Sequence, residues 1–147
     1  MNHNGLQYQA GYVQDFRKFE PTTTCGPGGI YFCEEKHAYM WTALYGTDLE
    51  YVCTVSLPRE AQVAKVGRGK WKADAVILGP PIPISYWLAS VDQELAFNCI
   101  LHNPYLLTKV PQTEDLCVRV LQYNKYAYKY IREKTSRVLR VAICDSA

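Results

Sequence analysis

Alternating apolar and polar positions predict short strands in the first half of the chain. The clearest alternation covers residues 50–57, where Tyr51, Cys53, Val55 and Leu57 interleave with their neighbours until Pro58 ends the pattern. Four more segments are predicted to be strands, with one or two strands in the first of them: residues 6–19, 29–33, 62–66 and 73–78. Turn-rich residues 21–29, the basic loop 67–70 and the proline-rich residues 79–83 separate these strands.

Helical signals gather in the second half, after an earlier helix that Glu34 and Glu35 open and Gly46 ends. Residues 90–93 resemble a capping box, Ser-x-x-Gln, which begins a helix that stops at Asn103-Pro104. Thr113 caps a longer helix with an apolar stripe of Leu116, Val120, Tyr123, Ala127 and Tyr130. Residues 138–144 are predicted to form a final strand.

This order of elements predicts an α+β fold, with a small, largely antiparallel sheet and helices packed on it. No linker and no internal repeat is evident, so residues 1–147 are predicted to form one domain. Tyr51, Tyr123 and Tyr130 are assigned to its core.

Composition indicates an ordinary soluble domain. The chain has 147 residues, 48% of them hydrophobic and 20% charged, with a formal net charge of +2. The polar first residues contain no secretory signal and no apolar run could span a membrane, so we expect a cytoplasmic protein without a membrane partner. The six cysteines form no C-x-x-C pair, which favours reduced thiols and predicts neither a disulfide framework nor a metal site.

The most distinctive string is Gly28-Gly29-Ile30-Tyr31-Phe32, because a glycine pair permits close backbone approach and the aromatic residue after it offers a stacking face. With the Tyr-Gly pair at 45–46 and the strand at 51–55, it resembles the nicotinamide-binding half of the poly-ADP-ribose-polymerase type of ADP-ribosyltransferase. The resemblance implies a degenerate transferase-like fold that binds NAD through Gly29, Tyr31 and Tyr45. It makes His3 and Glu94 candidates for the catalytic histidine and glutamate, although Glu94 also has an ordinary place in the first turn of a helix.

A second resemblance covers more of the chain. The segment from Cys25 to Gly29, the strands that follow and the Lys-Ala-Asp string at 72–74 are similar to small domains of large DNA viruses and phages. This resemblance implies a viral origin and a place in the host-cell cytoplasm, but no activity.

Two further leads concern charge and nucleophiles. Between residues 119 and 140, seven basic residues and four interleaved tyrosines accompany one acid, Glu133. A nucleic-acid or partner surface at Lys125, Tyr126, Lys129 and Arg132 is one interpretation, and a solvated helix face is the other. Residues 65–72 form a second basic cluster, and Cys33 with His37 has the spacing of an activated thiol.

Taken together, the sequence favours a non-catalytic binding or host-interaction module with a protein partner and no cofactor. One alternative is an NAD-binding ADP-ribosyltransferase-like enzyme that uses Tyr31. The other is a nucleic-acid-binding protein that uses the tyrosine-rich basic segment.

Overall fold

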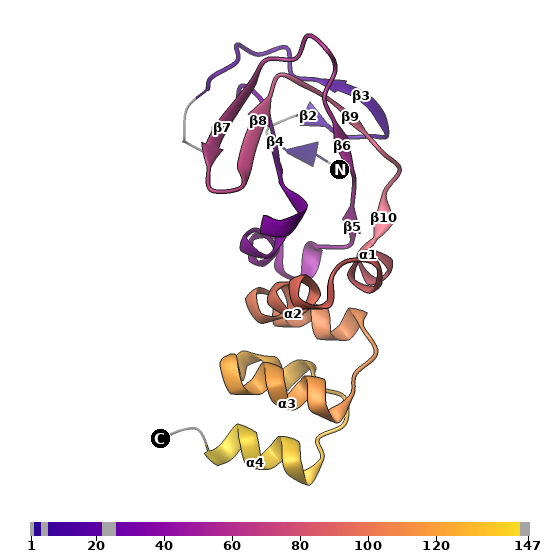
Figure 1. Ribbon diagram of the computed structural model, residues 1–147, viewed down its shortest axis with the longest axis vertical. Coiled ribbons are helices and arrows are strands. Elements are labelled where there is room, and N and C mark those ends of the chain that lie inside the picture. The colour runs from indigo at the N-terminus through magenta and orange to yellow at the C-terminus, as the bar shows by residue number, and fades with distance from the viewer. Residues whose placement is uncertain (1, 4–5, 22–25, 145–147) are drawn as a thin grey trace. The chain divides into compact units, whose positions relative to one another are not determined.

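The computed structural model describes residues 2–3, 6–21 and 26–144 and divides into two compact units. Unit 1 comprises Met1–Ala38 and Tyr51–Ile82, and unit 2 comprises Tyr39–Glu50 and Pro83–Ala147. Strands gather in unit 1 and helices in unit 2 (Figure 1), which confirms the α+β class. The expectation of one domain stays a prediction.

Unit 1 is built from small antiparallel sheets. One has the order β3 (Gly11–Gln14), β9 (Ala75–Leu78), β6 (Val55–Ser56), and the other has the order β4 (Ile30–Cys33), β8 (Lys70–Ala73), β7 (Val63–Gly67). The remaining elements that begin in this unit are β1 (Asn2–His3), β2 (Leu6–Gln7), the 3₁₀ helix η1 (Glu35–Met40), β5 (Tyr51–Val52) and β10 (Ile82–Pro83).

The core of unit 1 lies where the two three-stranded sheets meet. Its buried residues are Val13, Ile30, Ala73 and Val76, with Tyr8, Phe32, Val55 and Leu78 packed against them. Asp74 joins β8 to β9, and its backbone oxygen accepts a hydrogen bond from Asp15 N at 2.9 Å while its backbone nitrogen donates to Gln62 O at 3.0 Å. The chain therefore passes from one sheet to the other without leaving its backbone groups at Asp74 unpaired.

Three sequence predictions for unit 1 are wrong. The predicted strand at 50–57 is two short strands, β5 and β6, because Thr54 O between them accepts from Gly79 N at 3.0 Å and β6 pairs with β9. Tyr51 on β5 is 47% exposed and does not belong to the core. The predicted loop at 67–70 is a tight turn at Gly69, whose φ of +65° suits glycine, and Lys70 already begins the central strand β8.

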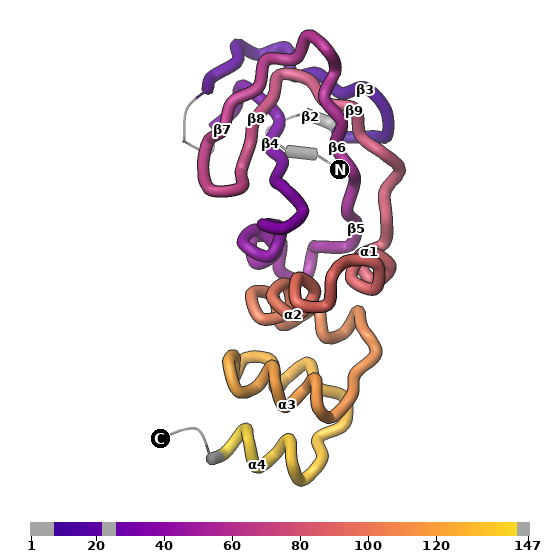
Figure 2. Tube along the Cα trace, viewed as in Figure 1, coloured from indigo at the N-terminus to yellow at the C-terminus, as the bar shows by residue number. Residues whose placement is uncertain are grey.

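Unit 2 is a stack of helices, and the layers of α2 (Gln93–His102), α3 (Glu114–Tyr123) and α4 (Ser136–Cys144) follow one another in Figures 1 and 2. Its other helices are α1 (Ile84–Ser90) and the 3₁₀ helices η2 (Thr42–Leu44), η3 (Gly46–Asp48), η4 (Pro104–Lys109) and η5 (Lys125–Tyr130). Among the residues described in the structure, no helix is both long and apolar enough to cross a membrane.

The predicted helix beginning at Thr113 is confirmed, since its hydroxyl accepts from Leu116 N at 3.1 Å. That helix ends at Asn124 rather than near Tyr130, and Tyr123 is 75% exposed, so its assignment to the core is wrong. The capping box is also misplaced, because Ser90 ends α1 and the carboxylate of Asp92 caps α2.

The predicted final strand at 138–144 is helix α4. Thr135 caps it by accepting from Val138 N at 3.3 Å, and Val138 is fully buried. The cap and the one-sided burial outweigh the strand propensity of the valines.

The expectation that no repeat exists is wrong for unit 2. The capping residues Asp92, Thr113 and Thr135 follow at intervals of 21 and 22 residues. After each of the first two caps come a ten-residue α-helix, an asparagine and a six-residue 3₁₀ helix. α4 takes the place of the α-helix in a third copy.

The asparagines between the two helices of each repeat connect the layers. Asn103 Nδ2 donates to Thr42 O at 3.1 Å and to Gly46 O at 3.0 Å. Asn124 Nδ2 donates to Leu101 O, at the end of the preceding repeat's helix, at 2.9 Å. Each asparagine therefore satisfies carbonyl groups of the layer before it, including those that a helix end leaves without an intrahelical partner.

Candidate functional site

The resemblance to ADP-ribosyltransferases directs attention first to Tyr31, on β4 of unit 1. Its hydroxyl donates to Gly26 O at 2.9 Å. The ammonium nitrogens of Lys70 and Lys72 lie 4.7 and 5.0 Å from the centroid of its ring. The tyrosine thus already has cation–π and hydrogen-bond partners within its own chain.

The space beside Gly29 is filled by the chain itself. Gly29 has a φ of +145°, and a Cβ at this position would lie 2.6 Å from two side-chain carbons of Lys72. Lys72 is fully buried, and its ammonium group donates to Glu20 O at 2.6 Å. The glycine pair therefore admits a lysine side chain at the position where the resemblance would place a ligand.

A buried carboxylate also binds the glycine turn. Asp15 Oδ2 accepts from Gly29 N at 3.1 Å, and its two oxygens accept from Arg17 Nε and a second Arg17 guanidinium nitrogen at 3.1 Å each. Burial alone would raise the pKa of Asp15, but the hydrogen bonds from Arg17 and Gly29 outweigh it and lower the pKa below its ordinary value. Asp15 is thus a charged anchor for the glycine turn.

The other residues of the NAD hypothesis lie in different parts of the chain. The side chain of His3 is outside the described residues. Tyr45 follows η2 and is 56% exposed. Glu94 lies in the first turn of α2, where its carboxylate is 3.8 Å from Arg119. Gly29 and Tyr31 belong to unit 1 whereas Tyr45 and Glu94 belong to unit 2, so neither unit alone holds the set.

Cys33 does not have the electrostatic setting of an activated thiol. Burial, with the neighbouring Glu34 carboxylate, raises the pKa of the Cys33 thiol. Nδ1 of His37 lies 3.3 Å from Glu34 Oε2. The histidine is thus placed to interact with the acid.

The other cysteines give no metal site in the part of the chain that the structure describes. No cluster of three or more histidine, cysteine or acidic side chains occurs there in an arrangement suited to a metal ion. Cys99 is fully buried, and His102 Nδ1 lies 2.8 Å from Asn98 O. Among the described cysteines, Cys33, Cys53 and Cys117 are free thiols.

Most residues of the predicted partner surface lie on one 3₁₀ helix of unit 2. We define the tyrosine-basic surface as Tyr123, Lys125, Tyr126, Lys129 and Arg132. Tyr126 and Lys129 are three residues apart on η5, so they project from the same side of a helix with three residues per turn. Asn124 places them, because its Oδ1 accepts from Tyr126 N at 3.0 Å and begins η5.

Sequence reasoning missed Tyr123 as a member of this surface. The sharp bend at Asn124, with φ of −146° and ψ of 104°, ends α3 and changes the direction of the apolar stripe. Tyr123 is 75% and Tyr126 82% exposed, although the stripe predicts the first of them to be buried. The signal that could have located the bend is the asparagine spacing, since Asn103 lies 21 residues earlier at the same place in its repeat.

Each cation of the surface contacts a neutral group. Lys125 Nζ donates to Val141 O at 2.8 Å, and an Arg132 guanidinium nitrogen donates to Thr108 O at 2.9 Å. Lys129 Nζ lies 5.0 Å from the ring centroid of Tyr130. Carbonyl oxygens and an aromatic ring contribute to placing these side chains, and every charged residue from 119 to 132 is basic.

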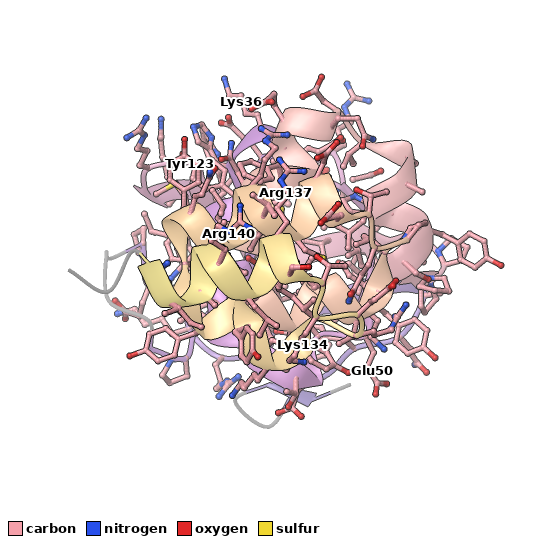
Figure 3. The ribbon with its side chains drawn as sticks, turned by 90° about the horizontal axis from the view of Figure 1, so that it is seen from below. Lys36, Glu50, Tyr123, Lys134, Arg137 and Arg140 are labelled. Carbon is pink, nitrogen blue, oxygen red and sulfur yellow. The ribbon has the colours of Figure 1, made fainter. Side chains whose placement is uncertain are left out.

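Arginines near this surface differ, because two of them are paired with acids. Arg119 lies 3.8 Å from Glu94, and Arg137 is paired with Asp115. Figure 3 looks onto α4 and shows Arg137 and Arg140 beside one edge of the helix and Lys134 beside the other. Positive charge therefore borders α4 as well as η5.

No model of a known protein family, no curated protein and no solved structure matches this chain.

Proposed function

We propose that this chain is a non-catalytic binding module whose tyrosine-basic surface binds single-stranded nucleic acid. The observation that carries the proposal is the pairing of an 82% exposed Tyr126 with Lys129 on one side of η5, in a segment whose charges are all basic. An exposed ring can stack on an unpaired base while neighbouring ammonium groups contact the phosphates.

Single strands fit this surface better than duplexes. Stacking needs a base whose face is open, and in a duplex both faces of an internal base are covered by its neighbours. Tyr123 and Tyr126 are 75% and 82% exposed, so the surface offers two rings on which a base could stack. Binding of this kind tolerates many sequences, because every base has a stacking face.

The test is fluorescence anisotropy with labelled twenty-nucleotide oligothymidine and oligouridine at about 50 mM salt. We expect Tyr126→Ala to weaken binding about tenfold, since stacking on one aromatic residue contributes about 1–3 kcal/mol. Tyr86→Ala is the matched control, because Tyr86 is 71% exposed on α1, outside the tyrosine-basic surface. It should leave the affinity unchanged.

Three results would overturn the proposal. One is the absence of binding at low salt. Another is an equal loss of affinity in Tyr126→Ala and Tyr86→Ala. The last is equally tight binding of an acidic polypeptide such as polyglutamate, which would show that the surface recognises negative charge alone and would favour a protein partner.

A further inference from the structure

The repeat of unit 2 gives α2, α3 and α4 one helix face in common, at equivalent positions of each copy. In each helix, three residues of this face lie four, five and eight residues after the capping residue. We call this face the stacking stripe, and it consists of Ala96, Phe97 and Ile100 in α2, of Cys117, Val118 and Leu121 in α3, and of Leu139, Arg140 and Ile143 in α4.

In α2 the stacking stripe is covered by the next helix. Phe97 has the guanidinium carbon of Arg119 4.1 Å from its ring centroid, and the ring of Tyr123 meets it edge-on with centroids 6.3 Å apart. Both covering residues belong to α3. All three stripe residues of α2 are at most 8% exposed.

The same face of α3 is covered by α4, whose first turn is tied to it. Thr135 donates to a carboxylate oxygen of Glu114 at 2.8 Å, and Arg137 pairs with Asp115. The stripe residues of α3 are at most 4% exposed, and α4 turns the buried Val138 toward this layer.

In α4 the side chains at the equivalent positions are exposed. Leu139 is 38% and Ile143 67% exposed, and Arg140 between them is also exposed. Two apolar side chains at i and i+4 on one helix face, at positions that are buried in both preceding helices, form a surface shaped for another helical layer.

Charge selects the occupant of this surface. Residues 134–143 contain no acid, and Arg140 lies within the stripe, whereas Arg137 is already paired with Asp115 of α3. In contrast, α2 and α3 each provide an acid to the following helix. A second copy joined through the same stripe by two-fold symmetry would bring like charges together around the shared apolar centre. An acidic helix would complement them.

We propose that the stacking stripe of α4 docks an amphipathic, acidic α-helix of a partner protein, which takes the place of the next layer of the stack. The partner's apolar residues cover Leu139 and Ile143, and one of its carboxylates pairs with Arg140. This surface and the tyrosine-basic surface have no residue in common.

The experiment uses two labelled peptides that copy residues 112–133, one unchanged and one with Arg119→Glu. In the layer below, Arg119 lies over the fifth position of α2, so the glutamate peptide places a carboxylate over Arg140. We expect the 147-residue protein to bind the glutamate peptide about fivefold more tightly than the arginine peptide. Arg140→Glu in the protein should reverse this preference.

Variants of the apolar residues test the docking face itself. Leu139→Glu and Ile143→Glu change exposed positions, so circular dichroism should remain that of the wild type while both peptides lose binding. Tyr86→Glu, an exposed position on α1, should keep binding, and so should Tyr126→Ala.

The docking proposal is overturned if neither peptide binds, if Leu139→Glu still binds, or if Arg140→Glu does not change the preference. Sedimentation adds one more outcome. A wild-type dimer that Leu139→Glu converts to a monomer would show that the occupant is a second copy, against the partner helix proposed here.

Discussion

Gly29 illustrates how a single residue without a side chain can determine the packing of its surroundings. Its φ of +145° is unfavourable for other residues, and its missing Cβ leaves the room that the buried side chain of Lys72 occupies. The exposed ammonium group that a basic loop would present is instead inside unit 1, where it donates to Glu20 O.

Replacing Gly29 by alanine should therefore destabilise the protein by about 2 kcal/mol or more, from backbone strain together with displacement of Lys72. Gly26→Ala is the matched control, because a Cβ there meets nothing within 4 Å. Urea unfolding followed by tryptophan fluorescence measures both variants. Equal stability of the two would contradict the packing of Lys72 on Gly29.

Asp15 makes the stability of unit 1 depend on pH in a defined direction. Its pKa is lowered in the folded protein, so the carboxylate stabilises the fold above the unfolded pKa of about 4 and loses this effect as pH falls toward the folded pKa. The difference in unfolding free energy between wild type and Asp15→Asn should be largest above pH 5 and shrink below pH 4. A difference that grows with acidity would contradict the Arg17 and Gly29 contacts.

At the scale of elements, the sequence predicts a helix or strand correctly where neighbouring residues alone determine it. Thr113, which two acids follow, predicts a helix start because its hydroxyl can accept from a backbone N–H of the first turn. The structure has this bond, from Leu116 N. The strand of Ile30 and its neighbours was predicted from an apolar run after glycines, and β4 confirms it.

The predictions fail where contacts with residues distant in sequence determine the secondary structure. Valines and isoleucine at 138–144 favour a strand locally, but burial of one side against α3 makes them a helix. Lys70, Trp71 and Lys72 resemble a loop by charge, but pairing on both sides makes them the central strand of a sheet. The sequence does not reveal the repeat, because its copies share few residues. For the same reason it does not predict the bend at Asn124 that leaves Tyr123 exposed.

The layer-connecting asparagines give a prediction for the stack. Asn103→Ala removes two hydrogen bonds to buried or half-buried carbonyl groups, and should lower the unfolding free energy by about 1–3 kcal/mol. Gln122→Ala, at an exposed position of α3, should change it by less than about 0.5 kcal/mol. Thermal or urea unfolding distinguishes the two, and a neutral Asn103→Ala would show that the connection is not needed.

For the whole molecule, the proposed nucleic-acid binding should depend on salt less steeply than it would for a strongly basic protein. The net charge is only +2, so the local cations Lys125, Lys129 and Arg132 carry the attraction. Three phosphate contacts predict a slope of about −2 for the logarithm of affinity against the logarithm of salt concentration, and Lys129→Ala should reduce its magnitude by about 0.7. A slope near zero, or one unchanged in Lys129→Ala, would contradict these contacts.

The asparagine-linked layers of unit 2 also have a consequence for how such a chain can change in evolution. The side-chain amide nitrogen of each of these asparagines donates to the layer before it, so cooperativity in this part of the chain is carried between nearest neighbours. Duplication of one 21-residue segment would add a layer through contacts that already exist, and loss of one would shorten the stack without altering its geometry. Length is thus an adjustable property of this unit, and the distance between its proposed binding surfaces could be tuned in steps of one repeat.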